Sequence, residues 1–259
     1  MGSQTLVISA AAALLWSACA SAQAQFDVAS VKPMNLTGEG SRRENVTVDP
    51  VSVTLRNVTL SSALQWAYNV KEYQVTGPGW IKDYRYEISA KSATPTSEDQ
   101  MRKMLQALLA DRFKVTLHHE TKDLTVYALT VAKGGLKMAP ADPGSQFEFQ
   151  RGGGTTLGAK AASIGDIADL LSQASRAIPD VPPVVDRTGL TGRYNLSIDA
   201  GEFMQSVQAE FQKGPPDPSA LVSVVQEILE KQLGLHSDLR KVRMDMLVID
   251  HADSMPIGN

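Results

Sequence analysis

The two halves of the chain repeat one order of structural elements, and this limits the possible folds more than any other sequence feature. The first half predicts a short helix from Asn57, a turn at 76–80, a strand at 84–89, a helix after Ser97 and strands at 113–119 and 124–132. The second half predicts a helix at 162–171, a turn at 186–189, a strand at 193–197, a helix after Asp217 and a strand at 244–250. Because each copy is too small to bury both faces of its sheet, we expect the copies to pack together. The pattern predicts an α+β fold of two tandem diverged helix–strand–helix–strand–strand repeats around small mixed or antiparallel sheets.

Local signals mark the helix ends. Ser97 and Gln100 have the spacing of a capping box, and apolar residues follow at the helical period at Met101, Met104, Leu105, Leu108 and Leu109. Asp217 is placed to cap a helix with Pro218 at its first position, where the missing N–H has no cost. Gly234 suits the end of that helix.

The predicted repeats set the domain boundaries. Residues 25–139 form the first repeat, with an extra N-terminal strand at 26–32, and residues 159–259 form the second. Residues 140–158 are rich in Gly, Pro and Asp and predict an exposed linker. Arg85-Tyr86 and Arg193-Tyr194 occupy matching places, so we expect both arginines to form repeated structural ion pairs and both tyrosines to be structural.

Residues 1–24 have the layout of a secretory signal peptide. Residues 6–18 are apolar and Ala-rich, and two Ala-x-Ala sites predict cleavage near Ala24. The alternative is a membrane anchor, but 13 residues are fewer than the roughly 18 that a spanning helix needs. We therefore expect a secreted or periplasmic protein with no transmembrane segment in the mature chain. Cleavage also removes Cys19, the only cysteine, which excludes disulfides, thiolate metal sites and cysteine nucleophiles.

Charge and motifs exclude several function classes. A net charge of −3 gives no electrostatic reason to expect nucleic acid as a partner. The sequence lacks the Gly-x-Ser-x-Gly elbow of many serine hydrolases, a P-loop and a dinucleotide fingerprint. The run Arg151-Gly152-Gly153-Gly154 has no strand and helix to position it over an anion, so a flexible linker is the better interpretation.

Several longer motifs resemble those of a known protein family. They are the start at 26–33, Ala67-Tyr68, Gly77-Pro78-Gly79-Trp80, residues 108–113, residues 185–194, and the ending at 247–251 with Pro256 and Asn259. The chain is similar to soil-associated secreted proteins, expanded in acidobacteria, whose shared domain has no assigned function. The resemblance covers essentially the whole mature chain and implies export and a common fold, without a catalytic assignment. A weaker similarity of fold to the short N-terminal domains of secretins and TonB-dependent receptors suggests binding or assembly.

Three of the four histidines lie near acidic residues at predicted strand ends. His118 and Glu120 share one strand face, and Asp250 and His251 lie at the end of the last strand with Asp253 close by. If the two ends meet, His118, Glu120, Asp250 and His251 are the catalytic candidates, and His118, Glu120, Asp250 and Asp253 the metal ligands. Oxygen and nitrogen ligands without thiolates favour Ca²⁺ or Zn²⁺. The alternative is that these are polar strand ends in solvent, since no HExxH or EF-hand spacing is present.

Aromatic residues cluster around the first predicted turn. Trp80, Tyr68, Tyr73 and Tyr84 are the ligand-binding candidates, because amphipathic aromatics near a surface turn suit a ligand or protein contact. The alternative is that they cover the core, and we expect this for Tyr86.

Three functions remain open from the sequence. The leading hypothesis is a secreted or periplasmic module that binds a small molecule or an envelope protein, because the duplication carries no catalytic signature. The first alternative is a metal-assisted hydrolase of small esters or lactones, which needs only an activated water and a polarised carbonyl. The second is an envelope scaffolding domain.

Overall fold

The computed structural model describes residues 25–34, 44–152, 154–175, 178, 181–213 and 217–257. The fold is α+β, as predicted, and the chain forms two compact units. The first contains the described residues up to His118 and from Val248 onward, and the second contains His119–Leu247. The predicted signal peptide lies outside the described residues. No helix within the described ranges is both long and apolar enough to cross a bilayer.

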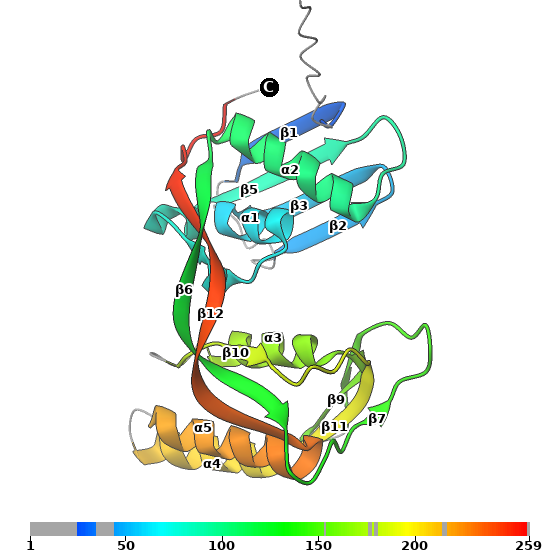
Figure 1. The fold of residues 1–259 in the computed structure, drawn as a ribbon, viewed down its shortest axis with the longest axis vertical. Helices are drawn as coiled ribbons and strands as arrows, with labels where there is room; N and C mark the ends of the chain where they lie inside the picture. Colours follow the sequence, from blue (N-terminus) through cyan, green and yellow to red (C-terminus); the bar gives the residue numbers. More distant parts are fainter. Residues whose placement is uncertain are drawn as a thin grey trace, which may run out of the picture. The chain divides into compact units, whose positions relative to one another are not determined.

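The first unit is built on an antiparallel sheet with the order β1-β5-β3-β2. Its strands are β1 (Val28–Pro33), β5 (Arg85–Lys91), β3 (Ser52–Thr59) and β2 (Asn45–Asp49). Helices α1 (Leu60–Tyr68) and α2 (Glu98–Arg112) lie against this sheet (Figure 1). Between α1 and β5 the chain forms two short 3-10 turns, Glu72–Gln74 and Gly79–Lys82, around β4 (Val75–Thr76).

The core of the first unit lies between the sheet and the two helices. Its fully buried members are Leu55, Leu60, Leu64, Tyr86, Ile88, Met101, Leu105, Leu109 and Phe113. The predicted cap of α2 is confirmed, since the Ser97 side chain accepts a hydrogen bond from the Gln100 N–H. The helical spacing recognised in the sequence thus supplies one wall of this core.

The second unit contains another four-stranded antiparallel sheet, with the order β7-β11-β9-β8. Its strands are β7 (Ala139–Pro140), β11 (Tyr194–Asp199), β9 (Thr156–Ala162) and β8 (Glu148–Arg151). Its helices are α3 (Ile164–Ser175), α4 (Gly201–Lys213) and α5 (Pro218–Ile228), and a π turn (Leu229–Leu233) continues α5. Figure 1 shows α4 and α5 side by side. The Asp217 cap, Pro218 at the start of α5 and left-handed Gly234 after the π turn are confirmed.

The predicted linker at 140–158 contains structure that the sequence analysis missed. Strand β8 and the first residues of β9 lie within it and pair with each other. The composition was misleading because Gly and Pro lie at the ends of the segment. Between them, residues 146–150 alternate polar and aromatic side chains, which is the period of a strand.

Two long strands, β6 (Thr116–Val131) and β12 (Leu235–His251), belong partly to each unit. They are the central pair of a sheet with the order β10-β6-β12-β4, in which β10 (Val184–Asp186) pairs with β6 in parallel. The prediction of separate strands at 113–119 and 124–132 is wrong. The exposed polar residues between them contain no Gly or Pro, so the strand continues through them. The strand predicted at 244–250 is likewise only the end of β12.

The two units show parallels that support the predicted repeat, which stays a prediction. Both four-stranded sheets place corresponding strands in the same order: β1, β5, β3 and β2 in one, and β7, β11, β9 and β8 in the other. In both, a helix follows directly after the third strand of this order. Each unit also contains one residue with positive φ near the end of that strand, Asn57 (φ 56°) and Ala161 (φ 48°).

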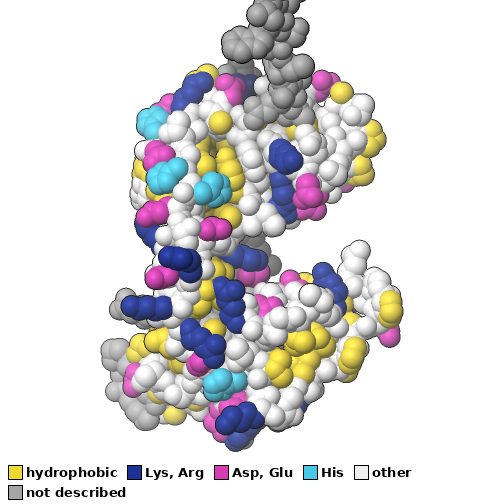
Figure 2. All heavy atoms as spheres, in the orientation of Figure 1, with side chains coloured by type: hydrophobic (Ala, Val, Ile, Leu, Met, Phe, Trp, Pro, Cys, Tyr) yellow, Lys and Arg dark blue, Asp and Glu magenta, His cyan; other side chains and the backbone are white. Residues whose placement is uncertain are grey.

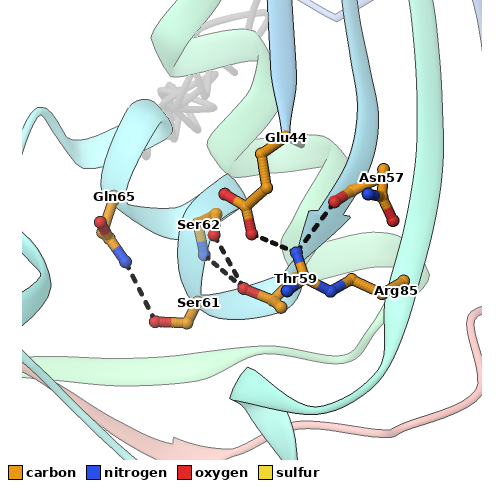
Figure 3. A network of polar contacts seen from close by, with 7 residues as sticks. All are labelled: Glu44, Asn57, Thr59, Ser61, Ser62, Gln65 and Arg85. Atoms are coloured by element: carbon orange, nitrogen blue, oxygen red, sulfur yellow. Dashed lines mark hydrogen bonds and ion pairs between the residues drawn. The ribbon is translucent and has the colours of Figure 1, made fainter. Parts of the chain in front are cut away.

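An arginine holds the backbone at each of these left-handed residues. Arg85 Nη1 donates to the Asn57 carbonyl oxygen at 3.0 Å and also pairs with the Glu44 carboxylate (Figure 3). Arg193 Nη1 donates to the Ala161 carbonyl oxygen at 2.7 Å. The strand register shifts at both places, so the regular sheet ladder is interrupted there. A backbone carbonyl that leaves the ladder needs another donor, and the guanidinium supplies it.

The residue that caps the following helix lies two positions after each left-handed residue. Thr59 accepts a hydrogen bond from the Ser62 N–H at 3.0 Å, and Ser163 accepts one from the Asp166 N–H at 3.1 Å. Arg193 also lies 3.8 Å from the Asp166 carboxylate. Both arginines therefore form the expected structural ion pairs, and both stabilise a strand-to-helix junction.

We predict that Arg85→Met and Arg193→Met each lower the free energy of unfolding by about 1–3 kcal/mol, because each leaves a carbonyl without its charged donor. Urea unfolding measures this change. Arg56→Met is the matched control. Arg56 is 69% exposed and lies 3.6 Å from Glu87, so its loss changes stability by less than about 0.5 kcal/mol. Equal effects of Arg85→Met and Arg56→Met would contradict the junction role.

Candidate functional site

The predicted histidine and carboxylate residues partly meet in the first unit. His118 near the start of β6 contacts Asp250 near the end of β12, with Nδ1 at 2.9 and 3.0 Å from the two carboxylate oxygens. Each side chain is about half exposed. Figure 2 shows histidine and acidic side chains exposed together on this surface. With Nδ1 held by the carboxylate, a neutral imidazole presents Nε2 as its proton acceptor.

The remaining predicted residues form different pairs. His251 Nε2 lies 3.2 Å from Asp253 Oδ1, and Glu120 lies 2.9 Å from Lys122. In the part of the chain that the structure describes, no three His, Cys, Asp or Glu side chains are grouped closely enough to hold a metal ion. The structure thus brings His118 to Asp250 and His251 to Asp253, but it does not group the four predicted metal ligands.

The predicted aromatic cluster is divided between surface and core. Trp80 and Tyr84 form a tilted pair with ring centroids 6.2 Å apart, and Tyr84 is 54% exposed. Tyr68 and Tyr73 are half-buried, and burial raises the pKa of Tyr68. Tyr84 is therefore the member most open to a ligand, while Trp80 is partly buried like Tyr68 and Tyr73.

Tyr86 is a core residue, as expected. It is 1% exposed, its ring meets Phe113 edge-on at 4.8 Å, and its hydroxyl donates to the Ser254 carbonyl oxygen at 2.6 Å. Burial, with a contribution from the nearby Tyr84, raises the pKa of Tyr86 to about 12. The protonated hydroxyl therefore holds the segment after β12 against the core of the first unit through this hydrogen bond.

The second unit contains an apolar cavity of about 120 Å³ that sequence reasoning missed. Side chains from α3, α4, α5, the π turn, β6, β10 and β12 line it, together with Ile178 and Val181. The lining residues are Tyr127, Leu171, Ala174, Ser175, Ile178, Val181, Val184, Phe203, Leu221, Val222, Val225, Gln226, Leu229 and Ser237. The sequence signal was the apolar face of α5, but that pattern is the same for a helix that packs into a solid core.

A few polar groups interrupt the apolar lining. Gln226 Nε2 donates to the Ser237 carbonyl oxygen at 3.1 Å, and the Ser175 hydroxyl donates to the Ser172 carbonyl oxygen at 3.0 Å. Ser237 is only 8% exposed. A concave apolar surface with a small number of placed polar groups is the usual form of a small-molecule site.

We predict a pH effect from Tyr86. Its pKa is higher in the folded state than the ordinary 10.0, so folding favours the protonated phenol. The stabilisation is complete below about pH 10. It is lost as the pH rises toward 12, the folded-state value. Denaturant unfolding between pH 9 and 12 measures this fall. Tyr86→Phe should remove most of it, whereas Tyr84→Phe should keep most of it. An identical pH profile for wild type and Tyr86→Phe would be evidence against the assignment.

The comparisons with known proteins identify a family without a known activity. No curated protein and no solved structure matches the chain. Residues 61–252, which include most of both units, match the family described as "Protein of unknown function (DUF3738)". The chain therefore belongs to the DUF3738 family of proteins of unknown function.

Proposed function

We propose that the protein is an exported module that binds a small, largely apolar molecule in the cavity of its second unit. The observation that carries this proposal is the cavity itself. Protein interiors are close-packed and contain few voids larger than a water molecule. A void of 120 Å³ lined by Leu, Ile, Val and Phe is close in size to cavities of about 150 Å³ that bind benzene.

The energetic cost of the cavity supports a binding role. Apolar side chains that face an open space lack packing partners on that side, which lowers the stability of the empty protein. Larger side chains at the helix positions that line it would remove this cost. A ligand of matching shape recovers the missing contacts, so the same space that weakens the empty protein provides affinity.

Sequence features support export. The Ala-rich segment at 6–18 with its Ala-x-Ala sites is typical of a cleaved secretory signal, and removal of Cys19 leaves a chain without thiols. The similarity to soil-associated secreted proteins expanded in acidobacteria agrees with this location. The ligand would then be a molecule that the protein meets outside the cytoplasm.

We predict that toluene raises the thermal unfolding midpoint of the full chain by several degrees, because it binds only the folded state. Val225→Phe fills the cavity, so this variant should show little or no rise. Val224→Phe is the matched control: Val224 lies on the same helix but does not line the cavity, and this variant should respond like wild type. If toluene fails to shift the midpoint of wild type, or shifts all three proteins equally, the cavity is not a binding site.

A second candidate function is ester hydrolysis at the His118–Asp250 pair, and the contact between these side chains favours it. Asp250 orients the imidazole, which leaves Nε2 able to take a proton from water as the water attacks a carbonyl. The alternative from the sequence is water activation by a Ca²⁺ or Zn²⁺ ion with His118, Glu120, Asp250 and Asp253 as ligands, although these four side chains are not grouped in the described part of the chain.

We predict that His118→Ala lowers the rate of p-nitrophenyl acetate cleavage by about 100-fold, the usual minimum for a general base. His236→Ala is the control, because His236 is also half exposed and lies beside an acidic residue, 3.7 Å from Glu230. Equal losses in both variants would show only the background reactivity of surface histidines. Loss of activity in EDTA and recovery with Ca²⁺ or Zn²⁺ would identify the metal-assisted form, and indifference to EDTA would exclude it.

A further inference from the structure

A glutamine lies at the point where the predicted signal peptide ends. We propose that the exported protein begins with pyroglutamate, formed from Gln25 after cleavage behind Ala24. This inference rests on the export that belongs to the proposed function, and it adds a modification site at the new N-terminus. It is independent of ligand binding in the cavity of the second unit.

The first support is that both predicted cleavage sites expose a glutamine. Cleavage after Ala24 leaves Gln25 as the first residue, and cleavage after Ala22 leaves Gln23 in that place. Both positions follow an Ala-x-Ala pattern, which is typical of signal-peptide cleavage sites. At either site, the new first residue therefore carries a primary amide that its own α-amine can reach.

The reaction needs only the groups of that one residue. The α-amine nitrogen attacks the side-chain carbonyl carbon Cδ, a bond forms between them, and the bond from Cδ to Nε2 breaks. A proton passes from the amine to Nε2, which leaves as ammonia, and the product is a neutral five-membered lactam. An α-amine has a pKa of about 8, so about a tenth of it is unprotonated at pH 7 and able to attack.

The second support is the position of Gln25 in the first unit. Gln25 is exposed and lies before strand β1. The backbone bond from the Asp27 N–H to the Lys91 carbonyl oxygen, at 2.8 Å, begins two residues later. A nitrogen that donates within a sheet ladder is held in place, whereas the Gln25 nitrogen precedes the ladder and can turn toward its own side chain.

The charges around Gln25 favour loss of the amine charge over its retention. Gln25 lines a polar pocket of about 180 Å³ together with Asp27 and Asp111. The Asp111 carboxylate lies 3.5 Å from Arg112 and 3.6 Å from Lys114, so it already has cationic partners. Asp27 is exposed, and water weakens an ion pair at an exposed carboxylate. An α-ammonium group therefore gains little from these carboxylates, and ring closure sacrifices little when it removes the charge.

The test uses the full precursor, exported by a bacterial host and purified from the periplasm. Intact mass spectrometry, with fragmentation of the N-terminal peptide, identifies the first residue and its mass. We expect a mature chain that starts at residue 25, is lighter than its encoded sequence by one ammonia, and gives no signal in Edman degradation. Treatment with pyroglutamyl aminopeptidase should restore the signal, with Phe26 as the first residue released.

Two matched variants change one glutamine each. In Gln25→Asn the amide is one methylene closer to the α-amine, so ring closure would need a strained four-membered ring. This variant should keep its full mass and give an Edman sequence. Gln23→Asn changes the glutamine that cleavage after Ala24 removes, so its mature chain should be blocked in the same way as wild type.

The outcomes separate this inference from the export on which it rests. A wild-type chain that is cleaved but keeps a free α-amine after prolonged incubation at neutral pH would overturn the modification and leave export intact. A blocked chain that starts at residue 23, or a mature chain that starts at any other residue, would overturn the assignment to Gln25. A chain that retains the Ala-rich segment at 6–18 would overturn both proposals. Each of these results is obtained on wild type, so none depends on the folding of a variant.

Discussion

In each unit, the junction between a central sheet strand (β3 or β9) and the helix that follows it depends on one arginine. This arginine donates a hydrogen bond to a backbone carbonyl oxygen at the junction. At this point the chain leaves a sheet and enters a helix within a few residues, through one residue in the left-handed region. Such a conformation is unfavourable for Ala161 and better tolerated by Asn57, and in both places it removes a carbonyl from the sheet ladder. Arg85 at the start of β5 and Arg193 directly before β11 donate to that carbonyl oxygen. This contact therefore links the arginine to the backbone at the point where the strand ends and the helix cap begins.

The two units use similar elements but differ in how completely their interiors are filled. In the first, aromatic and long aliphatic side chains such as Phe113, Tyr86 and Met101 pack with almost no exposure. In the second, leucines and valines from α3, α5, the π turn and β10 line a space that none of them fills. The first unit is closely packed, and the second contains the cavity. This contrast places the proposed ligand in the second unit, although the sequence candidates near Trp80 lie in the first.

The His118–Asp250 contact and the cavity represent different chemistry. The pair is exposed and polar, and an exposed contact of this kind contributes little to stability. In the proposed hydrolysis, the role of Asp250 is to orient the His118 imidazole toward a solvent water. The cavity is apolar and nearly free of polar groups, so its contribution to ligand binding would come from complementary shape and desolvation. Both belong to a family whose function is unknown, and the two proposals concern separate parts of the chain.

The sequence by itself determined the fold class and much of the local structure, because those features depend on neighbouring residues. Helix caps at Ser97 and Asp217, the helical period of α2 and the left-handed glycine at 234 act over a few positions, so they were predictable. The meeting of His118 and Asp250 was anticipated only as a possibility, from the position of both residues at strand ends. The continuous β6 strand was missed because exposed polar residues give no strand signal, although they can extend one. Only the tertiary structure decided the cavity, because its lining combines side chains from seven elements whose separate patterns all look like ordinary core. A cavity is the space that side chains from different elements leave between them, so no local sequence pattern predicts it.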